Sequence, residues 1–432
     1  MKLTISSVIL SVLVASSLVS SAPLDARHNK NRGKKMMGKA SQATLSSAAG
    51  AAYFLTNEPA GNFVVAASIG SDGKLTLRQA TSSDGAGSHG LGGDGPDPLF
   101  AQGAVKASAA GEIVAARKVN AGSNTISVFA IDPKNPTNLQ MIGQPIGSGG
   151  EFPMSVAINK AGNNVCALNS GSINGVACFA VDKAKGTIKP IANTVRSLKL
   201  NQTTPATGPA GTASHVIFSE DGTKLIASVK GVPPTPGIIA VWDVAKDGSL
   251  SKDFQPMQPA KGGLLPFSMT VIPGKNAILA TDAGVGAAIF DLNATPANGV
   301  AAGQSSILTI AGQKATCWSS FSQKTKNFYV TDIGTSQVTE ISLDNNLKPT
   351  IVKQYPQGDT VATIDNDIAT VGGNDFMFVL APNATQVRVL SLKAPGNAVA
   401  LQTLDIAGPA KAAGLPLNAA NLQGMTTFIK RA

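Results

Sequence analysis

Apolar positions along this chain occur in short runs, and Gly, Pro or polar turn residues separate each run from the next. The clearest unit spans residues 213–243, in which the runs 214–218, 224–229 and 238–242 are rich in Val, Ile and aromatic residues. Short runs of this composition, separated by turn signals such as 219–222, are typical of antiparallel strands. A sheet of so few strands cannot bury both faces, so the unit requires neighbours of the same kind.

The unit recurs along the rest of the chain. The further copies span residues 51–79, 105–132, 156–181, 267–291, 318–343 and 364–392. A spacing of about 50 residues without an intervening helical period is typical of ring-shaped repeat proteins. The apolar run 424–430 is expected to pair with residues 53–57, which removes the open edge of the ring. The sequence therefore predicts an all-β fold over residues 51–432, a seven-bladed β-propeller closed by pairing of the C-terminal strand with the first blade.

The N-terminal region differs in composition from the repeats. Residues 1–22 combine Lys2, an apolar run and the small residues Ser20, Ser21 and Ala22, which is the pattern of a signal peptide. We expect residues 23–50 to be a basic pro-segment or a disordered arm. The chain offers no second apolar stretch long enough for a membrane anchor, so the predicted location is extracellular or in a cell wall.

The net charge comes mostly from this leader. The chain has 35 Lys and Arg and 25 Asp and Glu, a net charge of +10. The first 39 residues hold seven of the basic residues and one acidic residue, which leaves 28 against 24 in the remainder, or +4. A balance this small requires no nucleic-acid partner. We expect a monomer.

The three cysteines and three sequons suit an oxidising compartment. Cys166 and Cys178 fall on two runs that should be adjacent strands, which favours a disulfide, with two buried thiols as the alternative. Cys317 is left unpaired. The glycosylation sequons are Asn201, Asn293 and Asn383, each in a predicted loop.

Two histidines are candidates for proton transfer, because histidine titrates nearest to neutral pH. His89 lies in a Gly-rich loop and His215 opens a predicted inner strand. A loop histidine and a histidine hydrogen-bonded within the ring are the alternatives. Polar and aromatic residues near the inner strands are candidates for substrate binding: Asp97, Gln102, Arg117, Lys230, Lys314 and Trp318. The sequence contains no recognised metal-binding, P-loop or Ser-nucleophile motif, so we expect neither a metal nor another cofactor.

Five stretches carry a resemblance to a known family: residues 56–59, 85–90, 95–100, 121–125 and 314–318. Together they resemble the fungal secreted 3-carboxymuconate cyclase-like proteins of the lactonase superfamily. His215 and the segment after it are similar to that superfamily's histidine, strand and turn motif, with Glu220 where proline is usual. The resemblance implies a propeller that opens or closes lactones by acid–base catalysis with side chains of the central channel.

Two functions therefore remain open. The first is a lactonase or muconate-type cycloisomerase acting on a small lactone or carboxylate, in which His89 or His215 moves the proton and Arg117, Lys230 or Lys314 holds a carboxylate or an oxyanion. The second is a non-catalytic extracellular or cell-wall glycoprotein that binds a glycan or a protein through its loops. Convergence of both histidines with a cation in one channel pocket would favour the enzyme.

Overall fold

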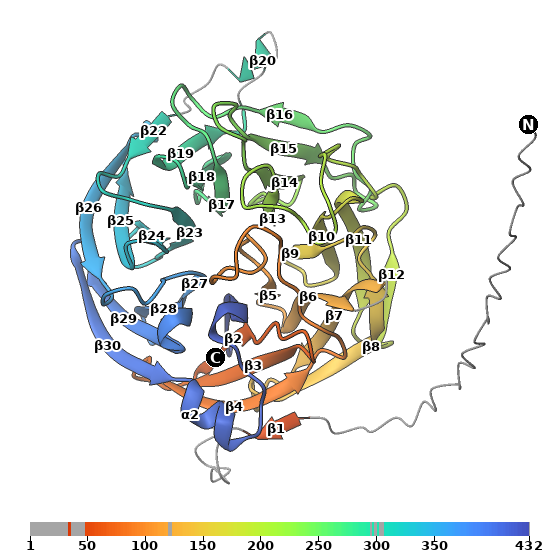
Figure 1. Ribbon diagram of the computed structural model, residues 1–432, viewed down its shortest axis with the longest axis vertical. Coiled ribbons are helices and arrows are strands. Elements are labelled where there is room, and N and C mark those ends of the chain that lie inside the picture. Colours follow the sequence, from red (N-terminus) through yellow and green to blue (C-terminus); the bar gives the residue numbers. More distant parts are fainter. Residues whose placement is uncertain are drawn as a thin grey trace, which may run out of the picture. The chain divides into compact units, whose positions relative to one another are not determined.

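Seven β-sheets stand in a ring around a central axis in the computed structural model (Figure 1). It describes residues 33–35, 48–119, 123–293, 296–297, 300–301 and 306–431. Within these residues, six sheets have four strands and one has five, and all of their strand pairs are antiparallel. The predicted all-β propeller of seven blades is confirmed. The expected signal peptide, residues 1–22, lies outside the described residues.

Blade 1 is built from both ends of the described chain, and blades 2 to 7 follow in sequence order. From the axis outward, blade 1 comprises β31 (Gln423–Ile429), β2 (Gly50–Leu55), β3 (Phe63–Ile69), β4 (Leu75–Ser82) and β1 (Gly33–Lys35). Blades 2 and 3 comprise β5 (Val105–Ala107), β6 (Glu112–Val119), β7 (Ser123–Ile131), β8 (Leu139–Gly147), β9 (Pro153–Ile158), β10 (Asn164–Ser170), β11 (Asn174–Asp182) and β12 (Thr187–Pro190).

Blades 4 to 7 repeat the same order. Blades 4 and 5 comprise β13 (Ala213–Phe218), β14 (Lys224–Val229), β15 (Ile238–Asp243), β16 (Gln255–Met257), β17 (Pro266–Val271), β18 (Ala277–Asp282), β19 (Gly286–Asp291) and β22 (Ser306–Thr309). Blades 6 and 7 comprise β23 (Thr316–Phe321), β24 (Phe328–Asp332), β25 (Gln337–Leu343), β26 (Pro349–Pro356), β27 (Asn366–Val371), β28 (Asn374–Ala381), β29 (Gln386–Ala394) and β30 (Asn397–Asp405). The remaining elements are β20 (Pro296–Ala297), β21 (Val300–Ala301), η1 (Pro382–Ala384), α2 (Ala407–Ala412) and η2 (Ala419–Asn421).

The ring closes through the C-terminal strand, as the sequence predicts. In β31, Ile429 pairs with Gly50 and Thr426 pairs with Tyr53 of β2. Because β31 is the innermost strand of blade 1, the C-terminus supplies the part of that blade nearest the axis. Glu58 strengthens the closure by accepting hydrogen bonds from the Asn418 backbone N–H and from Asn421 Nδ2.

Three residues of the predicted pro-segment or disordered arm, residues 23–50, form a strand. Gly33–Lys35 pair as β1 with the outer strand β4, and Gly50 already belongs to β2. The N–H and C=O groups of an edge strand are open to such pairing. The rest of that segment up to residue 47 lies outside the described residues.

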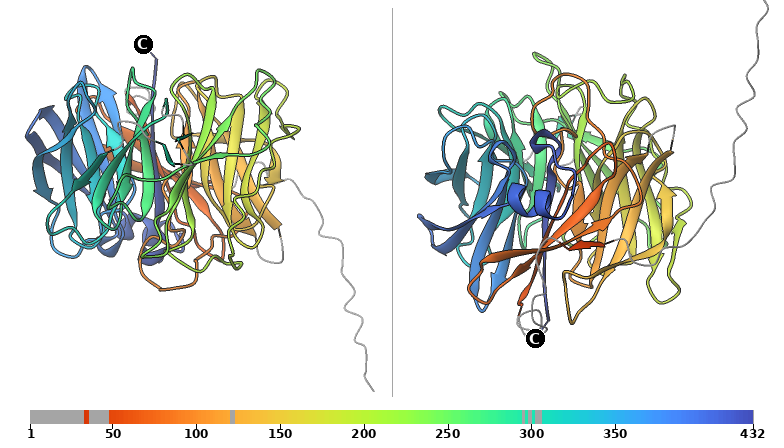
Figure 2. Two further views of the ribbon diagram at one scale, coloured as in Figure 1. Left: turned by 90° about the horizontal axis from the view of Figure 1, so that it is seen from above. Right: turned by 60° about the horizontal axis from the view of Figure 1, so that its bottom comes forward.

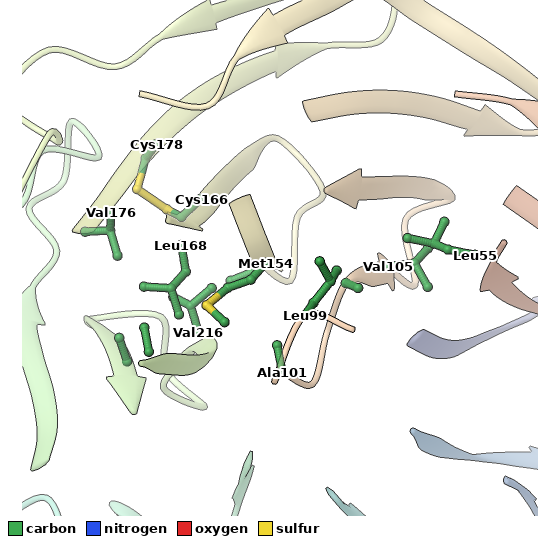
Figure 3. Packing of buried hydrophobic residues seen from close by; sticks show 14 of the residues in the cluster. Leu55, Leu99, Ala101, Val105, Met154, Cys166, Leu168, Val176, Cys178 and Val216 are labelled. Carbon is green, nitrogen blue, oxygen red and sulfur yellow. A yellow bond between two sulfur atoms is a disulfide. The ribbon is translucent and has the colours of Figure 1, made fainter. Parts of the chain in front are cut away.

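The blades stand side by side around the axis (Figure 2), and clusters of buried apolar side chains lie between neighbouring blades. Figure 3 shows one such cluster, in which Leu99 and Ala101 lie near Met154 and Val216. At its outer side Cys166 and Cys178, paired across β10 and β11, are joined by a disulfide. The segment before β5 is thus part of the core and not a surface loop.

Candidate functional site

One segment crosses the axis of the ring. We call residues 97–104, which join the connection after β4 to strand β5, the axial segment (Figure 1). The carbonyl of Phe100 accepts a hydrogen bond from Lys230 of blade 4 at 2.8 Å, and that of Ala101 accepts one from Trp318 of blade 6 at 3.2 Å. Gln423 of blade 1 also donates to the Ala101 carbonyl, at 2.8 Å. Tethers to three blades hold the axial segment in place.

Gln102 forms the end wall of a cavity on the axis. Its side-chain amide pairs with the Ser319 backbone, donating to the carbonyl at 3.0 Å and accepting from the N–H at 3.1 Å. Below it lies a cavity of about 400 Å³, which we call the axial cavity. It is lined by inner strands of six blades, and its mouth includes Lys160 and Ser219 from the turns after two of those strands. The predicted site residue Gln102 therefore lies in the cavity as part of its wall.

His215 lies in this wall and offers a hydrogen-bond donor. A register shift at the start of β13 places it opposite Ser228, with 1% of its surface exposed. Its Nδ1 accepts the Met269 backbone N–H at 3.0 Å, so the proton of the neutral ring is on Nε2. Burial, and then the charge of Lys106, lower the pKa of His215 well below its usual value, so the ring is neutral near pH 7. Nε2 has no hydrogen-bond partner among the described residues. It is a buried donor available to a ligand.

Lys106 brings a positive charge to the same cavity. It lies on β5, its side chain lines the cavity, and in the described part of the chain it has no ion pair within 4.0 Å and no hydrogen bond. Its charge acts on His215, on Asp365 and on Asp367. The ammonium group is therefore close to three functional side chains but is bound to none of them.

Two carboxyl groups lie on the same side of the axis. Asp367 lines the axial cavity and accepts hydrogen bonds from the Thr427 N–H at 2.7 Å and hydroxyl at 2.9 Å. Asp365 is fully buried and accepts from Gln423 at 2.7 Å. Burial raises the pKa of both, to about 7 for Asp365, while Lys106 opposes the rise. A carboxyl group with a pKa near 7, such as that of Asp365, can exchange protons near neutral pH.

Serine hydroxyls complete the wall between blades 5 and 6. Ser319 Oγ lies 2.8 Å from Ser268 Oγ and 2.7 Å from Thr270 Oγ1. Ser320, which also lines the cavity, has a buried Oγ without a partner among the described residues. The axial cavity thus contains two polar groups without a partner, the Ser320 hydroxyl and the His215 Nε2–H, beside the Lys106 ammonium and the Asp367 carboxyl group.

Two further predicted site residues, Lys230 and Asp97, are buried outside the lining of the axial cavity, and their polar atoms bind other groups of the protein. Lys230 donates to the carbonyls of Phe100 and Ala213, at 2.8 and 3.1 Å, and to the Ser214 hydroxyl. Burial lowers its pKa to about 7, against the opposing charge of Asp97. Asp97 accepts from the Ala101 N–H at 3.1 Å, and burial raises its pKa well above the usual value. Both side chains fix the axial segment, which differs from the substrate contacts that the sequence predicted for them.

The other predicted site residues lie away from the axial cavity. His89 has both ring nitrogens 3.0 Å from carbonyl oxygens of its own loop, those of Gly90 and Gly95, so the two histidines do not converge. The side chain of Lys314 is exposed, and Trp318 packs edge-on against Phe267 at 5.2 Å between ring centres. The Arg117 backbone belongs to β6, but its side chain lies outside the described part. The three sequon residues Asn201, Asn293 and Asn383 are exposed.

Sequence reasoning named neither Asp367 nor Ser320. Asp365 and Asp367 are two residues apart in an extended segment, and a spacing of two places side chains on one face of a strand. This alternation was the available signal for the carboxyl pair. Ser320 carries no comparable signal, because serines are frequent in every blade.

Over the described ranges, no group of three His, Cys, Asp or Glu side chains is arranged to hold a metal ion. A helix of the length and apolarity needed to cross a membrane is likewise absent from the described residues.

Comparisons with known proteins agree with this architecture. The model of the family "Lactonase, 7-bladed beta-propeller" matches residues 38–200. Among solved structures, a periplasmic gluconolactonase of Pseudomonas aeruginosa is similar with a TM-score of 0.60 and 16% identity, over 88% of this chain and 100% of that one. A candidate 6-phosphogluconolactonase of Bacteroides uniformis gives a TM-score of 0.58 and 15% identity, over 83% and 97%. A protein from Desulfotomaculum acetoxidans gives 0.53 and 13%, over 88% and 99%. A search of the curated proteins finds no match to this chain.

The chain is thus similar to the lactonase family over residues 38–200 and shares the propeller fold of these solved structures. At identities this low the solved structures support the fold alone.

Proposed function

We propose that this protein hydrolyses a small polar lactone in the axial cavity. The observation that carries the proposal is the buried, unpartnered Nε2–H of His215, in the same cavity as the ammonium of Lys106. Donors fixed where an oxyanion forms stabilise the transition state of acyl transfer. The names of the two similar solved structures, gluconolactonase and 6-phosphogluconolactonase, support the same class of substrate.

The residues suggest a division of roles. His215 and Lys106 would bind the lactone carbonyl oxygen, and Asp367 would take a proton from the attacking water. Water adds to the carbonyl carbon, and the tetrahedral intermediate then breaks its bond to the ring oxygen. The ring oxygen leaves as an alkoxide and receives the proton held by Asp367, so the product is the open hydroxy acid. With a carboxylated lactone, the more specific expectation from the sequence, Lys106 would pair with the carboxylate and His215 would bind the carbonyl oxygen.

The test is a kinetic comparison of purified variants. Ring opening of glucono-1,5-lactone, 6-phosphogluconolactone and muconolactone is followed by the acid released, after subtraction of spontaneous hydrolysis. We expect His215→Phe and Asp367→Asn each to lower kcat by about 10²- to 10³-fold, the range found when one oxyanion donor or one general base is removed. Lys106→Met, which removes the cation proposed to bind the carbonyl oxygen, should also lower kcat. Lys275→Met, a change of an exposed lysine outside the cavity, is its control.

Turnover of every lactone at the spontaneous rate would refute the proposal, as would wild-type rates in the His215→Phe variant. Loss of activity in His89→Gln but not in His215→Phe would move the site to the loop of His89.

We also propose that the protein acts outside the cell. The Cys166–Cys178 disulfide and the exposed sequon residues support this location, because such bonds persist in oxidising compartments. Mass spectrometry of the mature protein from its culture medium, before and after glycosidase treatment, tests it.

A further inference from the structure

A second hollow lies next to the axial cavity. This hollow of about 550 Å³, which we call the outer groove, lies between the turns at the ends of blades 3 and 4. It shares Lys160, Phe218 and Ser219 with the lining of the axial cavity. The two hollows therefore adjoin each other at these three residues.

The outer groove combines amides with an apolar floor. Asn163 and Asn164 line it, and within the described residues neither side-chain NH₂ group donates a hydrogen bond. Ala180, Ile191 and Phe218 supply apolar surface beside them. A sugar ring presents hydroxyls at its edge and C–H groups on its faces, and free amides next to apolar surface match both.

The carboxylates of the groove are already engaged. Asp221 accepts from Ser219 Oγ at 2.6 Å, and Asp247 accepts from Ser249 Oγ at 2.7 Å. These hydrogen bonds lower the pKa of both groups, so both remain anionic acceptors. Glu220, the third carboxylate of the groove, accepts from the Gly274 N–H at 2.8 Å. The three carboxylates and the ammonium groups of Lys160 and Lys246 leave a formal charge of only −1 in the lining, which suits a neutral ligand.

We propose that the substrate is a short oligosaccharide whose reducing end is an aldonolactone. The inference rests on the proposed function, because the lactone ring would occupy the axial cavity while the preceding sugars lie in the outer groove. A single lactone would occupy only the axial cavity. The combined volume of the axial cavity and the outer groove approaches the upper end of the range for small-molecule sites.

The chemistry of this substrate places the reaction in a sequence. An aldonolactone forms when the reducing-end hemiacetal loses two electrons and two protons from C1–H and O1–H to an acceptor such as dioxygen, which becomes hydrogen peroxide. The reaction that supplies the substrate is therefore the oxidation of the anomeric carbon by a separate oxidoreductase. Hydrolysis then adds one water and gives the aldonic acid.

The experiment compares kcat/KM for glucono-1,5-lactone with the 1,5-lactones of cellobionic, cellotrionic and maltotrionic acids. We expect kcat/KM to rise at least tenfold from one sugar to three in one of the two series. The double variant Asn163→Ala/Asn164→Ala should remove about tenfold of this gain and leave the rate on glucono-1,5-lactone unchanged, since one or two hydrogen bonds correspond to that factor. Asn345→Ala, a change of an exposed asparagine in a turn of blade 6, is the matched control.

Direct binding gives a readout independent of turnover. Calorimetric titration of cellotriose and maltotriose into the Asp367→Asn variant should show binding of one series that the double groove variant loses. Equal kcat/KM at every chain length, with no trisaccharide bound, would overturn the inference and leave the proposed function standing. Failure to hydrolyse any lactone would overturn the proposed function and this inference with it.

Discussion

The combined contribution of Lys230 and Asp365 to stability should be smallest near pH 7, because these two buried groups titrate there with opposite effects. Lys230 has its pKa lowered from 10.5 to about 7, and Asp365 has its pKa raised from 3.8 to about 7, both through burial. Between pH 7 and 10.5 the unfolded chain binds the Lys230 proton more tightly, so stability rises with pH. Between pH 4 and 7 the folded chain binds the Asp365 proton more tightly, so stability falls as pH rises.

The expected change in Tm follows from the two pKa shifts. Each pKa unit corresponds to about 1.4 kcal/mol, so the full shifts amount to about 5 kcal/mol for Lys230 and about 4 kcal/mol for Asp365. A domain of about 400 residues unfolds with an entropy of about 0.8 kcal/mol/K, so 1 kcal/mol moves Tm by about 1.2 °C. From pH 7 to 9.5 the wild type should gain about 4 °C in Tm relative to Lys230→Met. From pH 5 to 7 it should lose about 3 °C relative to Asp365→Asn.

The assay is thermal unfolding followed by the fluorescence of Trp242 and Trp318, both fully buried, at constant ionic strength. Lys230→Met also removes three hydrogen bonds, which lowers Tm at every pH. The prediction therefore concerns how the Tm difference between wild type and variant changes with pH, and not its size at pH 7. Lys314→Met, a change of an exposed lysine, should track the wild type. A wild-type minus Lys230→Met difference that stays within 1 °C from pH 7 to 9.5 would refute the reasoning.

Three further predictions concern stability. Gly103 has φ +82°, and an added Cβ would lie 3.0 Å from the His215 ring, so Gly103→Ala should cost about 1–3 kcal/mol and lower lactone turnover. Gly312→Ala, at φ +77° in open space, should lower stability through the same backbone strain but leave turnover unchanged. If both variants change turnover equally, the contact of residue 103 with the His215 ring has no role in catalysis. Removing the Cys166–Cys178 bridge, which closes a loop of 12 residues, should cost about 3 kcal/mol in thermal unfolding, and reduction should then affect only the wild type. Glu58→Ala leaves two donors of the C-terminal segment without acceptors, so it should cost about 2 kcal/mol and speed hydrogen exchange in β31; unchanged exchange there would contradict this role.

Much of the fold could be predicted from short-range patterns. The turn after β13 uses Ser219 and Gly222, with the Gly222 N–H donating to the Ser219 carbonyl at 3.0 Å, and it lies where the sequence places it. The last repeat is predicted to begin at residue 364, whereas the inner strand of blade 7 is β27, Asn366–Val371. Apolar residues precede that strand as well as follow it, so local hydrophobicity could not fix its start.

The candidate site could be predicted only in part. His215 opens an inner strand, which the repeat indicates, and Gln102 falls in the segment before β5. His89 and Lys230 have the residue types of a site, but their ring or ammonium donors are taken by backbone carbonyls. A sequence records which donors exist and does not record which acceptors meet them.

The sequence by itself determined the seven repeats, the alternation that turns one face of each strand inward, and the pairing of the last strand with the first sheet, because these depend on local periodicity and turn chemistry. The tertiary structure decided that the axial segment crosses the ring, that Lys230 is fully hydrogen-bonded while Lys106 is not, and that the cavity adjoins the outer groove. The physical reason is that these properties arise from contacts between blades far apart in the chain. Burial and hydrogen-bond satisfaction at such contacts are set by the closed ring and not by neighbouring residues.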